Sequence, residues 1–147
     1  MLMSGCLFCR IAAGMVPAYK VYEDDRVSAF LDINPSAIGH VLIIPRIHVS
    51  RIEDLSVLDA EALFKTLHRL VKPIRIGVGT AAVMLGVNDG PGSGQEIPHV
   101  HIHVIPRSPG DGGTIIQSTI HIRKPTPEKL EITAEKIRRQ LSLSVNP

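Results

Sequence analysis

Three histidines recur at every second position within residues 98–107, which read PHVHIHVIPR. Strict alternation with apolar residues is typical of a half-buried strand, so one face of this strand would carry Val100, Ile102 and Val104 into a core. The opposite face would then present His99, His101 and His103. A lone histidine in a strand is usually an ordinary surface or core residue. Three imidazoles on one face instead favour a site that holds a phosphate group or a metal ion.

A glycine-rich loop, residues 88–95 (NDGPGSGQ), immediately precedes this histidine strand. The free backbone N–H groups of such a loop can cradle an anion. Two histidines in a His-x-His pair could instead supply two ligands to a zinc ion that keeps an open position for water. The loop and the histidines together favour the phosphate interpretation over the metal one.

Cys6 and Cys9 form a second pattern with chemical potential, a Cys-x-x-Cys pair. A redox motif of this kind normally opens a helix after a strand, whereas Gly14 and Pro17 interrupt the chain almost at once. Structural zinc needs four ligands, so histidines would have to complete a site that the two thiols begin. Two ordinary buried thiols are the remaining alternative.

Composition limits the classes of protein that the chain can represent. Its 147 residues suit a single domain over residues 1–147, and its formal net charge is +2. Basic residues are scattered apart from Arg138 and Arg139, and aromatic residues make up 3% of the chain, which argues against nucleic-acid binding. Apolar runs such as residues 41–44 are far shorter than a membrane span, and residues 1–13 lack the apolar stretch of a signal peptide. We therefore expect a cytoplasmic protein that binds neither membranes nor nucleic acid.

The elements that must position these residues can be predicted from periodicity. A β-hairpin is expected over residues 19–31, a strand buried on both faces over residues 40–44, and a fourth strand over residues 83–87 before the glycine loop. Between them, Ser56 and Asp59 resemble a capping box, and apolar residues then recur at helical spacing until Pro73, which should kink or end the helix near Lys72. The members of this apolar stripe are Ala60, Leu63, Phe64, Leu67, Leu70 and Val71.

A last helix should begin after Thr126, with Leu130, Ala134, Ile137 and Leu141 on one face. Residues 114–123 alternate only in part and predict no element. Strands followed by a helix and further strands indicate an α+β fold rather than repeated βαβ units.

The segment from His99 to Ile105 matches the pattern His-φ-His-φ-His-φ-φ, where φ is apolar, and it thereby resembles the histidine triad (HIT) family. Further landmarks occur in the family's order: the Cys-x-x-Cys pair, which is found in certain prokaryotic members, and the segments YEDD, FLD, GHVLIIP and NDG. The resemblance implies a HIT-like fold with a five-stranded antiparallel sheet, a long central helix and a C-terminal helix. It also implies a symmetric homodimer with joined sheets.

The resemblance further implies a binding site for a small nucleotide, a purine mononucleotide. Apolar side chains would surround the base, namely Leu7, Phe8, Ile11 and Phe30, and Asp32 would accept hydrogen bonds from the ribose hydroxyls. The loop positions that would hold the phosphate are Asn88, Gly94, Gln95 and Glu96. Glu96 departs from one branch of the family, which has serine there, and a carboxylate cannot donate to a phosphate, so only its backbone N–H should help.

Catalytic and metal-binding roles follow from the same resemblance. His101 would be the nucleophile, His103 would stabilise charge on the phosphate, His40 would assist, and His99 would contribute indirectly. Cys6, Cys9, His48 and His99 would bind one structural zinc ion, and no organic cofactor is expected. The expected activity is cleavage or transfer of a nucleoside monophosphate through a nucleotidyl-histidine, from a phosphoramidate, an acyl adenylate or a dinucleoside polyphosphate. The alternative is a zinc-containing nucleotide-binding interaction protein with little turnover.

Overall fold

The structure is a computed structural model that describes residues 5–114 and 124–144. The chain falls into two compact units, Met1–Asp111 and Gly112–Pro147, which are considered separately. The expectation of a single domain over residues 1–147 therefore stays a prediction. Residues 115–123, most of the segment for which the sequence predicted no element, lie outside the described residues.

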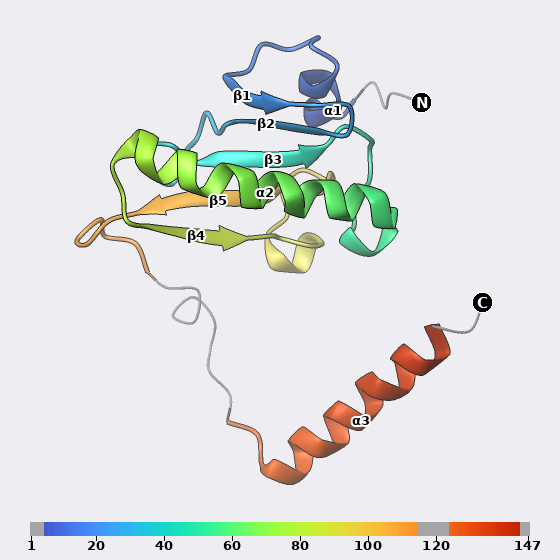
Figure 1. Cartoon of the computed structure of the whole chain (residues 1–147). Helices are drawn as coiled ribbons and strands as arrows, with labels where there is room; N and C mark the ends of the chain where they lie inside the picture. Colours follow the sequence, from blue (N-terminus) through green and yellow to red (C-terminus); the bar gives the residue numbers. More distant parts are fainter. Residues whose placement is uncertain (1–4, 115–123, 145–147) are drawn as a thin grey trace. The chain divides into compact units, whose positions relative to one another are not determined.

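Five antiparallel strands form one sheet in the first unit, in the order β1-β2-β3-β5-β4 (Figure 1). The strands are Lys20–Glu23 (β1), Val27–Leu31 (β2), Val41–Pro45 (β3), Ala82–Gly86 (β4) and Ile102–Arg107 (β5). The predicted α+β fold with a five-stranded antiparallel sheet is confirmed, including the hairpin of β1 and β2. All five residues of β3 are buried, as the apolar run predicted.

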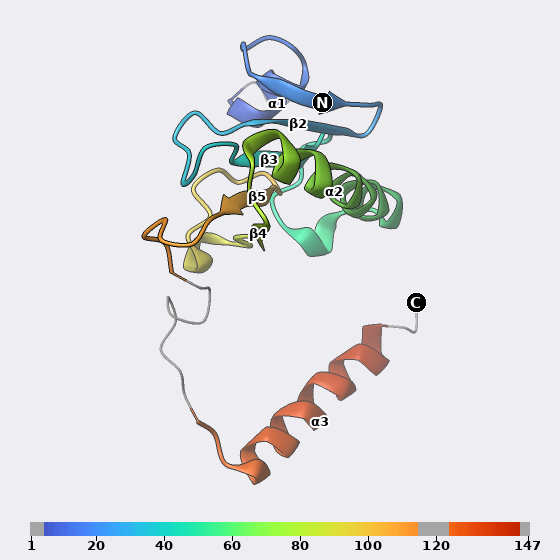
Figure 2. The same ribbon diagram turned by 60° about the vertical axis from the view of Figure 1, so that its left-hand side comes forward.

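Two apolar cores lie on the two faces of this sheet because alternate residues of β2 and β3 point to opposite sides. The first core contains Val27 and Ile43 and packs against α2, Val57–Val78. The second contains Phe30 and Leu42 and packs against the short helix α1, Leu7–Ala12. Figure 2 shows α2 running along one side of the strands and α1 beside β1 and β2. The sheet thus separates the long helix from the cysteine-bearing helix.

The long helix α2 begins as predicted, because Ser56 accepts a hydrogen bond from the backbone N–H of Asp59 at 3.1 Å. Of the two outcomes predicted for Pro73, a kink or an end near Lys72, the end is wrong: the helix continues through Pro73 to Val78 and is capped by Gly79 at φ +73°. Pro73 lies on an exposed stretch of the helix, while Ile74 still packs against the core and holds the last turn in place. The apolar stripe is also narrower than predicted, since Phe64 is 61% exposed.

The histidine strand is shorter than its alternation predicted, because β5 begins only at Ile102. The partner strand β3 ends at Pro45, which has no N–H to donate, and the N–H of Val100 bonds instead to the carbonyl of Val49 at 2.7 Å. The burial pattern nevertheless persists, with Val100, Ile102 and Val104 all in the core beneath α2. The imidazoles of His99 and His101 consequently project from an irregular segment on the other side.

Two short 3₁₀ turns, Ile52–Asp54 (η1) and Pro91–Ser93 (η2), flank the approach to this segment. In the second unit, the predicted C-terminal helix is present as α3, Pro127–Ser144, and the backbone N–H of Lys129 donates to Thr126 Oγ1 at 3.3 Å. Within the described ranges, no helix has both the length and the apolar character needed to cross a membrane.

Candidate functional site

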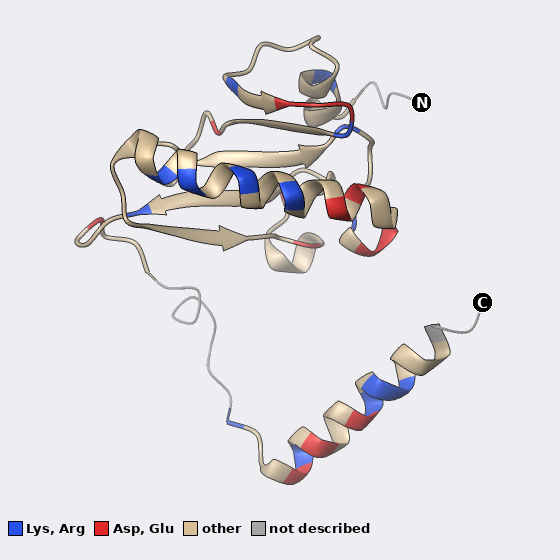
Figure 3. Ribbon diagram, in the orientation of Figure 1, with Lys and Arg blue, Asp and Glu red and all other residues tan. Residues whose placement is uncertain are grey.

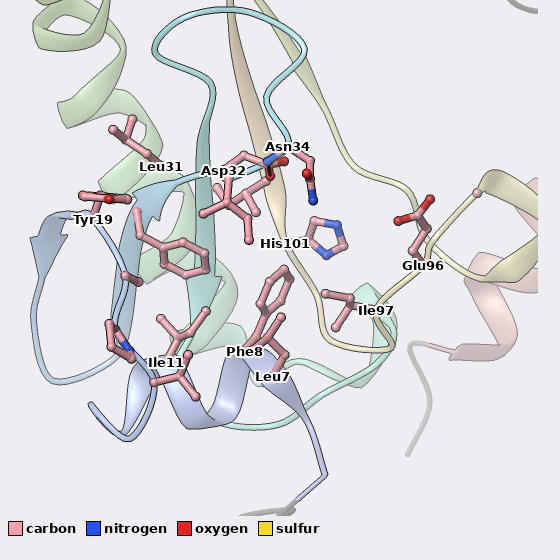
Figure 4. A pocket seen from close by; sticks show the side chains of 17 residues that line it. Leu7, Phe8, Ile11, Tyr19, Leu31, Asp32, Asn34, Glu96, Ile97 and His101 are labelled. Atoms are coloured by element: carbon pink, nitrogen blue, oxygen red, sulfur yellow. Dashed lines mark hydrogen bonds between the residues drawn. The ribbon is translucent and has the colours of Figure 1, made fainter.

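A cavity of about 650 Å³ opens on the α1 side of the sheet (Figure 4). The four apolar residues expected around a base all line it, namely Leu7, Phe8, Ile11 and Phe30. The rings of Phe8 and Phe30 meet edge to face, with their centroids 5.6 Å apart. Helix α1 and strand β2 therefore build an apolar wall of the kind that accepts a planar ring.

Several further lining residues were not predicted from the sequence. They are Val16, Pro17, Ala18, Tyr19, Leu31, Ile33, Asn34, Leu42 and Ile97. Most belong to the segment between α1 and β1 or to the loop after β2. These residues are close in sequence to residues that were predicted to line the site, and this closeness was the only indication of their role. Which side of each loop faces the cavity depends on tertiary packing, which the sequence does not give.

Asp32 lies at the end of β2 and contributes a carboxylate to the cavity. Its Oδ1 accepts a hydrogen bond from the backbone N–H of Asn34 at 2.9 Å, which orients the group. Its Oδ2 lies 3.5 Å from Nδ1 of His40. A carboxylate at the rim of an apolar cavity can accept hydrogen bonds from ligand hydroxyl groups.

His101 stands at the inner boundary of the cavity, 6% exposed, with its ring 5.2 Å from that of Phe8 and 4.8 Å from that of His103. Its Nδ1 lies 2.7 Å from the backbone carbonyl oxygen of His99, which can only accept a hydrogen bond. Nδ1 must therefore carry the proton, and Nε2 keeps a free electron pair. That arrangement is what a nucleophilic imidazole requires.

A second chain of hydrogen bonds fixes the tautomer of His103. The backbone N–H of Ser36 donates to Nδ1 of His40 at 3.2 Å, so the proton of His40 resides on Nε2. That Nε2 lies 3.0 Å from Nδ1 of His103 and donates to it. His103 must then carry its own proton on Nε2. The sequence alone gave no indication of the Ser36 contact, because it depends on how the loop after β2 folds back.

Burial keeps both members of this pair uncharged at neutral pH. Desolvation lowers the pKa of His103 to about 4, with smaller contributions from the neighbouring His101 and His40. Desolvation also lowers the pKa of His40, against the opposing influence of Asp32. The pair therefore offers one N–H donor, Nε2–H of His103, rather than a positive charge to a bound group.

Hydrogen bonds of two of its own side chains, those of Asn88 and Gln95, hold the glycine loop in place. The side chain of Gln95 accepts from the N–H of Gly90 at 2.8 Å and donates to the carbonyl of Ser50 at 2.9 Å, and the amide of Asn88 donates to the carbonyl of Ser93. These two side chains hold the loop, whereas Gly94 and Glu96 line the cavity. The assignment of all four positions to a phosphate stays a prediction.

A compact group of thiols and imidazoles lies directly behind the cavity wall. The ligand atoms of Cys6, Cys9, His48 and His99 all lie within 4.8 Å of one another. Nδ1 of His99 is 3.5 Å from Sγ of Cys6 and 3.6 Å from Sγ of Cys9, and Nδ1 of His48 is 3.3 Å from Sγ of Cys9. A tetrahedral zinc ion with bonds of about 2.3 Å to sulfur and 2.0 Å to nitrogen would place such atoms about 3.5 Å apart. The donor set and its spacing therefore fit zinc.

The chemistry of the individual groups agrees with this fit. Burial lowers the pKa of His99 to about 4, so its imidazole is neutral, and its Nε2–H donates to the carbonyl of Pro45 at 2.9 Å. This bond leaves Nδ1 free to act as a ligand, and it is a typical supporting contact of metal-bound histidine. Burial raises the pKa of Cys9 to about 11, so its thiolate needs a nearby cation. The imidazole of His99 thus belongs to the group of thiols and imidazoles, and its backbone carbonyl contacts His101.

Comparison with known proteins agrees with these features. The sequence model of the HIT domain matches residues 13–110. The chain is 36% identical to Protein hit of Bacillus subtilis over 145 residues, covering 95% of this chain and 96% of that protein. It is 36% identical to adenosine 5'-monophosphoramidase HNT1 of Saccharomyces cerevisiae over 118 residues, covering 78% of this chain and 70% of that protein.

Solved structures give the same result. SMU.412c from Streptococcus mutans superimposes with a TM-score of 0.87 at 32% identity, covering 95% of this chain and 87% of that one. A zinc-bound histidine triad family protein from Mycobacterium smegmatis superimposes with a TM-score of 0.70 at 29% identity, covering 95% of this chain and 97% of that one.

Proposed function

Because this chain belongs to the HIT family, we propose that it is a hydrolase that releases a nucleoside monophosphate through a covalent nucleotidyl-histidine. The observation that carries the proposal is the free Nε2 of His101 at the boundary of an apolar cavity of nucleotide size. The similarity to a yeast adenosine 5'-monophosphoramidase supports nucleotide hydrolysis as the class of reaction. Transfer of the nucleotidyl group to an acceptor other than water would use the same intermediate.

Binding would place each part of the nucleotide against a matching surface. The base, a purine, would lie against the apolar wall that Phe8, Ile11 and Phe30 build together. Asp32 would accept hydrogen bonds from the ribose hydroxyls. The backbone N–H of Glu96 would meet the phosphate oxygens, because Glu96 lines the cavity whereas the N–H groups of Gly94 and Gln95 already donate to the carbonyls of Pro91 and Gly90.

The reaction would proceed in two displacements at phosphorus. In the first, Nε2 of His101 forms a bond to phosphorus while the bond to the leaving group breaks. The leaving atom keeps the electron pair and takes the Nε2 proton of His103, which a proton from solvent replaces, so that a nucleotidyl-imidazolium remains beside neutral histidines. In the second, water adds to phosphorus, the P–Nε2 bond breaks, and the proton lost by the water returns to solvent. Nucleoside monophosphate and the protonated leaving group are the products.

The test compares His101→Ala and His103→Ala with the wild type on an adenosine phosphoramidate. His101→Ala loses the nucleophile and should lower kcat by many orders of magnitude. His103→Ala loses one stabilising donor and should lower kcat about 10²- to 10³-fold. Intact-mass measurement should detect an adenylyl adduct on the wild type and on His103→Ala, but not on His101→Ala. His68→Ala, on the exposed face of α2, is the matched control.

Two results would overturn the covalent mechanism. One is a His101→Ala protein that retains more than about a hundredth of wild-type kcat, since that loss is no larger than the loss of a single donor. The other is tight binding of AMP without turnover or adduct, which would instead identify a nucleotide-binding interaction protein.

The second part of the proposal is a structural zinc ion held by Cys6, Cys9, His48 and His99. When bound, zinc supplies a closed tetrahedral crosslink and no chemistry at the substrate. The zinc-bound relative from Mycobacterium smegmatis supports this choice of metal. Two thiols that must remain reduced to bind metal also favour a cytoplasmic location.

A homodimer joined at β4 is the third part of the proposal. This strand forms one edge of the sheet, and its five residues, AVMLG, carry no charge that would block pairing with another strand. Leu85 on β4 is 41% exposed, and Phe64 on the neighbouring helix is 61% exposed. Sedimentation at micromolar concentration should show a dimer for the wild type and a monomer for Leu85→Lys. A monomeric wild type would contradict the assignment.

A further inference from the structure

The charged groups around the cavity are of one sign. Two carboxylates line it, those of Asp32 and Glu96, and none of the described lining residues is a lysine or an arginine. Four basic residues of α2, namely Lys65, Arg69, Lys72 and Arg75, lie instead on the helix that covers the other face of the sheet (Figure 3). A phosphate-binding cavity lined by lysine or arginine attracts the substrates that carry the most negative charge. A cavity lined by carboxylates has no such preference, so another property of the substrate must determine its selectivity.

Glu96 holds the position that matters most for this discrimination. It is exposed, it follows the glycine loop, and in the view of Figure 4 His101 lies between Glu96 and the apolar wall. A nucleoside on the apolar wall with its phosphorus at His101 therefore leaves the side of Glu96 for the group attached to phosphorus.

A cation beside the glycine loop, Arg51, does not line the cavity and so does not offset this carboxylate there. The guanidinium of Arg51 packs against Gly90, where an added Cβ would lie 1.8 Å from Nη1. Its Nε lies 4.0 Å from a carboxylate oxygen of Glu53, and Arg51 is not among the residues that line the cavity. The negative charge of Glu96 therefore faces the leaving group without a cationic partner in the lining.

We propose that Glu96 selects the leaving group by charge, so that the preferred substrates are nucleoside phosphoramidates whose leaving amine carries an additional ammonium group. Dinucleoside polyphosphates, whose leaving group is a polyanion, should be poor substrates. This inference rests on the proposed function, because it assumes that a P–N bond is cleaved at His101. It adds the chemical class of the leaving group, which neither the histidine pattern nor the fold specifies.

The expected effect is moderate because Glu96 is exposed to solvent. Two unit charges a few ångströms apart at a solvated surface change a rate or an affinity by about three- to tenfold, and added salt reduces the effect. A buried carboxylate would give a far larger factor. The test must therefore measure ratios between matched substrates rather than absolute rates.

The experiment uses three adenosine phosphoramidates of similar length, made from a propane diamine, n-butylamine and β-alanine, which end in an ammonium, a methyl and a carboxylate group. For the wild type, kcat/KM should rise about three- to tenfold from methyl to ammonium and fall by a similar factor from methyl to carboxylate. Glu96→Gln should compress all three values to within about twofold, and Glu96→Lys should reverse the order. Glu61→Gln, exposed on α2, should keep the wild-type order.

Failure of this inference can be distinguished from failure of the proposed function. If the wild type hydrolyses all three compounds equally well, or if Glu96→Lys keeps the wild-type order, the charge-selection role of Glu96 is wrong while the hydrolase assignment stands. If none of the three compounds yields AMP or an adduct, the proposed function itself fails. Faster hydrolysis of a diadenosine polyphosphate than of the ammonium compound would also overturn the inference.

Discussion

Removal of the proposed zinc ion is the perturbation whose consequences can be worked out most fully from the structure. The four ligands come from α1 and the residue that caps it, from the segment after β3 and from the segment before β5, so one ion would crosslink three parts of the chain. Cys9→Ala deletes one of these ligands at a position that is 2% exposed. We expect this variant to purify without stoichiometric zinc and to unfold at a lower temperature than the wild type.

The metal contribution should exceed the packing contribution. Zinc at about a thousandfold excess over its dissociation constant stabilises the folded state by about 4 kcal/mol. A chain of this size shifts its Tm by about 3–5 °C per kcal/mol, so the metal accounts for about 12–20 °C. The cavity left by one buried sulfur atom accounts for only about 1 kcal/mol, or about 4 °C.

The assay is thermal unfolding of wild type and Cys9→Ala, each with zinc and with chelator, together with elemental analysis. Chelator should lower the Tm of the wild type by about 12–20 °C and leave that of Cys9→Ala nearly unchanged, because the variant has no complete site to lose. Ala12→Gly, another buried position on α1, should keep the full response to chelator. A wild type that holds no zinc, or a chelator effect of equal size in Cys9→Ala, would refute the reasoning.

Three further predictions follow from single residues. Because burial lowers the pKa of His103 to about 4, the unfolded chain takes up its proton first as the pH falls below about 6.5. His103 should therefore contribute about 1–2 kcal/mol to the decrease in the free energy of unfolding between pH 6.5 and pH 4, and denaturant titration should show a correspondingly smaller decrease for His103→Asn. Gly39→Ala should destabilise by about 2–4 kcal/mol, since Gly39 has φ +82° and an added Cβ would lie 2.5 Å from Cγ1 of Val78. Gly79→Ala, at φ +73° with open space around it, should lose only about 1 kcal/mol in the same titration, and equal losses would contradict the clash. Phe8→Ala should destabilise by about 3–5 kcal/mol and weaken AMP binding measured by calorimetry, whereas Phe8→Leu should retain most of both. Unchanged AMP affinity in Phe8→Ala would show that the Phe8 ring does not contact the base.

Features set by local periodicity could be predicted from the sequence, and features set by tertiary contacts could not. Alternation correctly indicated that Val100, Ile102 and Val104 enter the core, because side chains of an extended chain alternate in any context. The late start of β5 could not be predicted, because it depends on where the partner strand ends at Pro45. Helical spacing likewise placed Phe64 on the apolar stripe of α2. Whether a residue at the edge of this stripe is buried depends on the width of the sheet beneath the helix, and Phe64 is left exposed.

The same distinction holds within the candidate site. The Cys-x-x-Cys pair indicated a metal but could not select its partners, because the chain contains seven histidines and the two in the cluster lie 39 and 90 residues from Cys9. The resemblance to known HIT proteins named His48 and His99, and the structure places both beside the thiols. A backbone carbonyl was expected to set the tautomer of His101, and the structure identifies it as that of His99. The tautomer of His103 was out of reach of the sequence, because it depends on the N–H of Ser36 in a folded loop.

Helix α1 explains why the proposed zinc site and the proposed nucleotide cavity lie back to back. A helix of six residues has almost no stability of its own, because few backbone hydrogen bonds offset the cost of nucleation. Its Cys9 points to the metal cluster while Phe8 contacts the rings of Phe30 and His101, so both faces of one short helix are used. Zinc would anchor α1 on one side and thereby fix the apolar wall on the other. A metal that never touches the substrate can in this way determine whether the base has a surface to bind.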